Sequence, residues 1–211
     1  MRLLLAIALV LAPLAGARAH PHGWIDIRTE VLTDDEGRVT GLRQAWLFDE
    51  LYSAFMLDDL EREGFGREEG LARLLRQDVA ALAPHDYFTR VEVDGEPVRF
   101  GEVRAYANGV AAGRIWFRFE LPLAEAVDPA AGELRYAVFD PTYYIEILHH
   151  GDAPVELPDP LAERCEVRVI APDPPAEIVS LAAVVDRSDE SDAGLGRHFA
   201  QWVELACAPS S

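Results

Sequence analysis

Most of this chain consists of short segments in which apolar and polar residues alternate, separated by turn-forming residues. Alternation with a period of two turns every second side chain toward a core, which is typical of strands covered on one face. Residues 24–32 and 39–48, with Asp34-Asp35-Glu36-Gly37 between them, predict a hairpin. Further strands are expected at residues 88–93, 98–107, 114–121, 133–139, 143–148 and 165–170.

Two segments that follow the first hairpin have a different period. In residues 51–61 and 68–82, leucines and other apolar residues recur at mainly helical spacing. A short helix is also expected at residues 177–185, and residues 197–207 fit either a strand or a helix. The sequence therefore predicts an α+β fold that is mostly β, an antiparallel β-sandwich with a helical insertion after the first hairpin.

The N-terminal residues have the three parts of a secretory signal peptide. Arg2 precedes an apolar run over residues 3–14, and Ala17-Arg18-Ala19 is a small-x-small cleavage site. We expect residues 1–19 to be removed after Ala19, which leaves a single β-rich domain at 20–211 and, in a bacterium, a periplasmic protein. The apolar run is shorter than the roughly 20 residues of a membrane span, so no membrane insertion of the mature chain is expected.

Two cysteines, Cys165 and Cys207, lie in the mature part. An even number of cysteines in an oxidising compartment predicts a disulfide, which in the loop-entropy model stabilises the fold by roughly 4 kcal/mol. Two free buried thiols are the alternative.

The net charge of the chain limits the classes of molecule that it can bind. The formal net charge is −18, and loss of Arg2 and Arg18 with the signal peptide makes the mature chain more negative still. Such a surface repels nucleic acid and anionic lipid and favours cations.

The mature N-terminus is a candidate metal chelate. Cleavage after Ala19 makes His20 the first residue, with an α-amino nitrogen and an imidazole, and His22 follows Pro21. The amine, with an ordinary pKa near 7.7–8.0, is deprotonated at modest cost, and residues i and i+2 of an extended segment face the same side. Pro21 has no amide proton, which excludes the square-planar complex that a third-position histidine commonly forms. Further ligands must therefore come from elsewhere in the fold.

Asp49, Asp140 and His149 are the further ligands that we expect, because carboxylate and imidazole suit Zn, Ni, Co or Cu. Of the adjacent His149 and His150, at most one joins a given site, since neighbours in a strand face opposite ways. For Asp49 the alternative is a cap on the helix that follows, and for the N-terminus it is fraying without metal. No organic cofactor is expected.

Enzymatic activity is not expected. The sequence has no Gly-x-Ser-x-Gly motif and no His-Glu-x-x-His motif, and a disulfide would leave no cysteine nucleophile.

Four motifs in this order resemble an uncharacterised periplasmic family that is often described as an ABC-type transport system periplasmic component. They are residues 19–26, 44–50, 139–144 and the C-terminal 199–207. Members of that family are often encoded beside, or fused to, nickel/cobalt efflux-type membrane transporters. The resemblance implies a protein that handles divalent transition metals, with a membrane metal transporter as its partner.

Three functions are consistent with these observations. The first is a periplasmic accessory protein that binds Ni, Co, Zn or Cu for a membrane transporter. The second is a metal-free interaction module of a transport system. The third is a copper oxidase that resembles the histidine-brace monooxygenases, which needs a second histidine beside a tyrosine.

Overall fold

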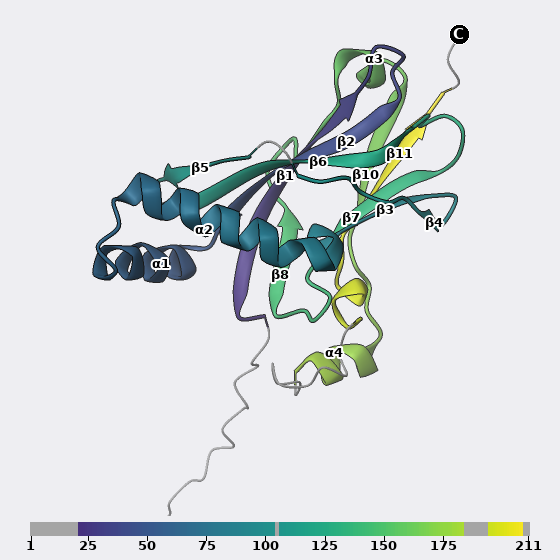
Figure 1. Ribbon diagram of the computed structural model, residues 1–211. Helices are drawn as coiled ribbons and strands as arrows, with labels where there is room; N and C mark the ends of the chain where they lie inside the picture. The colour runs from purple at the N-terminus through teal and green to yellow at the C-terminus, as the bar shows by residue number, and fades with distance from the viewer. Residues whose placement is uncertain (1–20, 104–105, 184–193, 209–211) are drawn as a thin grey trace, which may run out of the picture.

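Two β-sheets form the framework of the protein, and a pair of helices extends from one of them (Figure 1). The computed structural model describes residues 21–103, 106–183 and 194–208. The first sheet has the order β5-β6-β2-β1-β8, with β9 also paired to β1, and the second has the order β10-β11-β7-β3-β4. The predicted signal peptide and His20 lie outside the described residues.

The strands and helices have the following bounds. The first sheet contains β1 (Gly23–Thr33), β2 (Val39–Phe48), β5 (Tyr106–Ala111), β6 (Arg114–Val127), β8 (Ile145–His149) and β9 (Val155–Glu156). The second contains β3 (Thr89–Val93), β4 (Glu96–Pro97), β7 (Leu134–Val138), β10 (Cys165–Ile170) and β11 (Trp202–Cys207). The helices are α1 (Glu50–Arg62), α2 (Arg67–Leu82), α3 (Asp159–Ala162) and α4 (Ala176–Ala182), with 3₁₀ turns at Ala83–Phe88 and Gly196–His198.

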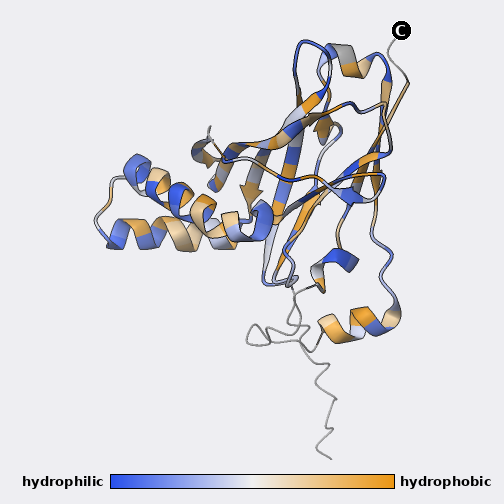
Figure 2. Ribbon diagram, turned by 45° about the vertical axis from the view of Figure 1, so that its right-hand side comes forward, coloured by the Kyte–Doolittle hydropathy of each residue, from blue (hydrophilic) through white to orange (hydrophobic). Residues whose placement is uncertain are grey.

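The long strands β1, β2 and β6 have an inner face that is covered by two different partners. Toward one end, Val31 and Leu42 meet Val91 and Tyr136 of the second sheet. Toward the other end, aromatic residues face helices α1 and α2 instead. Figure 2 shows apolar and polar positions interleaved along the strands and on both helices. Each large apolar side chain buried in this way contributes roughly 1.5–3 kcal/mol.

The structure confirms the α+β, mostly β fold, with the helical insertion directly after the first hairpin. It differs from the expected antiparallel pattern along one edge of β1, which pairs in parallel with β8 and with β9. The chain reaches β8 through the second sheet rather than through a hairpin, and a parallel pair requires such a crossover.

One predicted strand is wrong. Residues 98–107 are not a continuous strand, because β4 ends at Pro97 and β5 begins only at Tyr106. The turn expected around residues 109–113 is present at the end of that range. Gly109 belongs to β5, where the indole of Trp116 would contact any side chain at this position. The turn itself falls at Ala112-Gly113, both with positive φ.

The disulfide between Cys165 and Cys207 is confirmed. The two cysteines are directly opposite each other in the β10–β11 pair, with 4.0 Å between their Cα atoms. Within the described part of the chain, none of the helices has the length and apolar character needed to cross a membrane.

Candidate functional site

A large cavity lies between the helical pair and the first sheet, and its volume is about 670 Å³. Its floor is aromatic and comes from the inner faces of β2 and β6, with Trp46, Phe48, Phe117 and Phe119. Its roof is formed by Phe55 and Met56 of α1 and by Leu75, Asp78, Val79 and Leu82 of α2. Volumes of roughly 300–1,000 Å³ with mostly apolar walls are typical of small-molecule sites.

The chain enters the fold at the mouth of this cavity. The backbone N–H of His22 donates to the carbonyl oxygen of Tyr144 at 2.8 Å, and the two rings stack with their centroids 4.6 Å apart. Both residues line the cavity. His22 is exposed and therefore lies at the opening of the cavity.

The carboxylate of Asp49 accepts hydrogen bonds from both the beginning of β1 and the beginning of α1. Its Oδ1 accepts from the backbone N–H of Tyr52 at 2.8 Å, which makes it the N-cap of the helix, and its Oδ2 accepts from the N–H of Trp24 at 3.2 Å. The alternative interpretation of Asp49 as a helix cap is thus confirmed. A carboxylate has about four lone-pair positions, so these two bonds leave acceptor capacity on the side of the cavity.

Asp78 is a cavity residue that sequence reasoning missed. Burial is the one cause of its shifted pKa, which is raised to about 6, and the carboxylate has no hydrogen bond or ion pair to any described residue. Asp78 lies on the same face of α2 as the buried Leu71, Leu74 and Leu75. One signal in the sequence could have revealed Asp78, because it follows Leu71, Leu74 and Leu75 at helical spacing and so lies on their apolar face.

Asp140 does not line the cavity, and its carboxylate holds a turn of the chain instead. It is 4 % exposed, and its Oδ1 accepts from both the N–H and the hydroxyl of Thr142, while its Oδ2 accepts from the N–H of Ile145. These bonds shape the turn that leads into β8 and occupy both carboxylate oxygens.

His149 also lies apart from the start of β1. Gly23 pairs with Ile145 and Ile27 pairs with His149, so four strand residues, or about 13 Å, separate the two levels. The Nε2 atom of His149 is 3.4 Å from the Tyr136 hydroxyl and 3.5 Å from the Thr29 hydroxyl. Burial lowers the pKa of His149 to about 4, although a hydrogen bond with Gln201 opposes this shift.

The structure thus brings together two of the predicted ligands, His22 and Asp49, and separates Asp140 and His149 from them. His20 falls outside the described residues. Within the described ranges, no group of three or more histidine, cysteine, aspartate or glutamate side chains is arranged to hold a metal ion. A complete metal site at the mouth of the cavity therefore needs ligands from outside the described residues.

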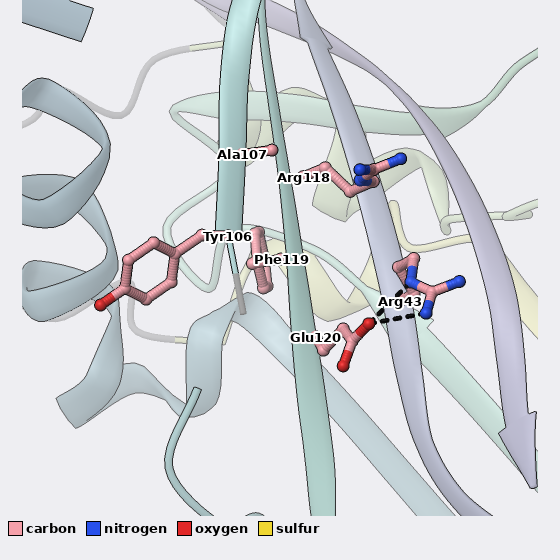
Figure 3. Close-up of a pocket in the computed structure, with 6 residues that line it drawn as sticks. All are labelled: Arg43, Tyr106, Ala107, Arg118, Phe119 and Glu120. Carbon is pink, nitrogen blue, oxygen red and sulfur yellow. Dashed lines mark hydrogen bonds and ion pairs between the residues drawn. The ribbon is translucent and has the colours of Figure 1, made fainter. Parts of the chain in front are cut away.

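A second hollow, of about 340 Å³, lies where β5 meets the outer face of the first sheet (Figure 3). Arg43 there binds Glu120 and Glu30, which neutralise its charge. Figure 3 shows the Tyr106 side chain directed away from this cluster. Half-exposed ion pairs such as those of Arg43 contribute little to stability.

Comparison with known proteins assigns a family to the chain. A family model described as "Protein of unknown function (DUF1007)" matches residues 5–207. An uncharacterized protein from Haemophilus influenzae is 25% identical over 195 residues, which cover 91% of this chain and 93% of the relative. The chain therefore belongs to the DUF1007 family.

Proposed function

We propose that this protein works outside the cytoplasm as an accessory protein that binds one divalent transition metal ion and serves a membrane metal transporter. The ion is Zn, Ni, Co or Cu, and its ligands are the α-amine and imidazole of His20, the imidazole of His22 and the carboxylate of Asp49. Asp140 and His149 are not among the ligands in this proposal, because both are engaged elsewhere in the fold.

The observation that carries the proposal is the position of His22 and Asp49 at the mouth of the same cavity. Asp49 accepts from the N–H of Trp24, two residues after His22, so that its carboxylate lies beside the path of the N-terminal segment. Nitrogen donors combined with a carboxylate suit these four metals. The acidic net charge of the chain raises the local concentration of cations.

Two further observations support work in the periplasm. The disulfide fits an oxidising compartment, where such bonds persist. The signal peptide predicted at residues 1–19 provides the export route. The link to a transporter depends on the family resemblance of the four motifs.

Native mass spectrometry of the exported protein tests the proposal. The full-length chain is expressed through the secretory route, and the mature product is mixed with one equivalent each of Zn, Ni, Co and Cu. We expect a mass that begins at His20 and retains one ion. His20→Ala abolishes retention, and Asp49→Asn weakens it while keeping a good N-cap residue.

His85→Ala is the matched control, since His85 is exposed and does not line the cavity. It must retain the ion as the wild type does. A mature chain that starts at another residue, or that retains none of the four metals, contradicts the proposal and favours the metal-free interaction module.

A further inference from the structure

The carboxylate of Asp78 is the most unusual group in the cavity. It lies on the roof, on α2, and no hydrogen-bond donor or cation among the described residues satisfies it. Acids that are withdrawn from water without a partner destabilise a fold, so their presence in a cavity is a frequent sign of ligand binding.

The remaining walls supply no positive charge. The described residues that line the cavity include no arginine, and the sequence contains no lysine. Tyr52 on α1 lies within reach of two acids of the cavity, because burial and then the charges of Asp78 and Asp49 raise its pKa. The potential inside the cavity is therefore negative, and His22 is the one basic residue among its described lining groups.

Partly exposed aromatic residues complement this charge. Trp46, Phe117 and Phe119 are only 2–3 % exposed and form the buried base of the floor, whereas the rings of Tyr52 and Phe88 line the cavity and are partly exposed. Ring faces bind apolar groups, and they also attract cations through their quadrupoles. An apolar body against these partly exposed rings and a cationic head toward Asp78 satisfy both surfaces at once.

We infer that this cavity binds a small organic amine, with its apolar or aromatic body against the partly exposed rings of Tyr52 and Phe88 and its ammonium group paired with Asp78. The ammonium donates hydrogen bonds to the Asp78 carboxylate. This inference goes beyond the proposed metal site, which lies at the mouth and uses different ligands.

The volume of the cavity agrees with this class of ligand. About 670 Å³ accommodates a molecule well above the size of a single ring. Phe55 lines the cavity and is also 64 % exposed, so α1 provides a side through which a ligand can enter.

Isothermal titration calorimetry with matched probes tests the inference. The mature protein is first dialysed against EDTA and then titrated with 2-phenylethylamine and with 2-phenylethanol, which have the same apolar body and differ in charge. We expect the amine to bind about 10- to 100-fold more tightly than the alcohol, as a charge-assisted hydrogen bond in a buried site provides.

Asp78→Asn must reduce the affinity for the amine by about the same factor and leave that for the alcohol nearly unchanged. Asp152→Asn, which removes the same charge at an exposed position outside the cavity, must bind both probes as the wild type does. Equal affinities for the two probes, absence of amine binding, or amine binding that survives Asp78→Asn each overturn the inference.

The two proposals fail independently. His20→Ala removes the proposed metal site and must leave amine binding intact, while Asp78→Asn removes the amine site and must leave the retained metal ion in native mass spectrometry.

Discussion

Burial raises the pKa of Asp78 from 3.8 to about 6, so the folded chain holds a proton on this acid that the unfolded chain releases. Between these two pKa values the folded state binds more protons than the unfolded state, and the free energy of unfolding falls as the pH rises. The stabilisation is complete below pH 3.8 and is lost above about pH 6. At pH 7 the ionised Asp78 therefore costs the fold about 3 kcal/mol.

Asp78→Asn removes this cost, so we expect the variant to be more stable than the wild type at pH 7 and nearly equal to it below pH 4. Urea unfolding from pH 3.5 to 7.5 measures the difference in the free energy of unfolding between the two chains. Asp152→Asn is the control for loss of a surface charge. A difference between Asp78→Asn and wild type that does not change with pH contradicts the assignment of Asp78 as a buried, unpaired acid.

Some residues of the candidate site could be predicted from the sequence, and others could not. His22 and Asp49 were found because they lie near the N-terminus and at a helix start, where sequence position alone indicates a role. Asp140 was chosen for its motif, but its oxygens accept from residues two and five positions later within a buried turn. The burial that makes Asp140 structural depends on long-range packing, which no local pattern reports.

At the scale of elements, the disulfide fixes an edge strand. β10 pairs with β11 on one side only, and its residues Val169 and Ile170 are substantially exposed. The disulfide at one end of this pair clips β10 to the sheet where side-chain burial contributes little. Holding this edge in place also protects it from pairing with other chains.

Replacing both cysteines by serine should therefore lower the free energy of unfolding by roughly 4 kcal/mol, chiefly by releasing the unfolded chain from the closed loop. Hydrogen exchange should become faster in β10 and remain slow in β1 and β2. Reduction of the wild type under native conditions is the control, and it should reproduce the double variant. A loss of stability below about 1 kcal/mol would mean that packing alone holds β10.

The elements themselves were predictable where their signals are local. The hairpin of β1 and β2 and the helices α1 and α2 follow from periodicity within one segment. The parallel pairing of β1 with β8 was not predictable, because more than a hundred residues separate the partners and alternation does not encode direction. The cavity was not predictable for the same reason, since its floor and its roof come from separate segments that meet only when α2 folds over the sheet.

For the whole molecule, the contact between the two sheets includes a buried polar cluster around His149. His149 belongs to β8 of the first sheet, its Nε2 approaches the hydroxyl of Tyr136 on β7 of the second, and its backbone N–H donates to Gln201 before β11 at 2.7 Å. A charge on this imidazole would lie between the layers. The packing of the sandwich is thus linked to the protonation of one residue.

Because burial lowers the pKa of His149 from 6.5 to about 4, the unfolded chain binds a proton in this range that the folded chain does not. The free energy of unfolding is unaffected by this group above pH 6.5 and falls as the pH decreases toward 4, by about 3 kcal/mol in total.

His149→Phe has no such group, so its stability relative to the wild type should rise by that amount between pH 7 and pH 4. Chemical unfolding at half-unit pH steps measures the difference, with the exposed neighbour variant His150→Gln as the control for loss of a surface imidazole. Parallel pH profiles for wild type and His149→Phe would show that His149 accepts a proton in the folded state, and that the two sheets separate enough there to admit water.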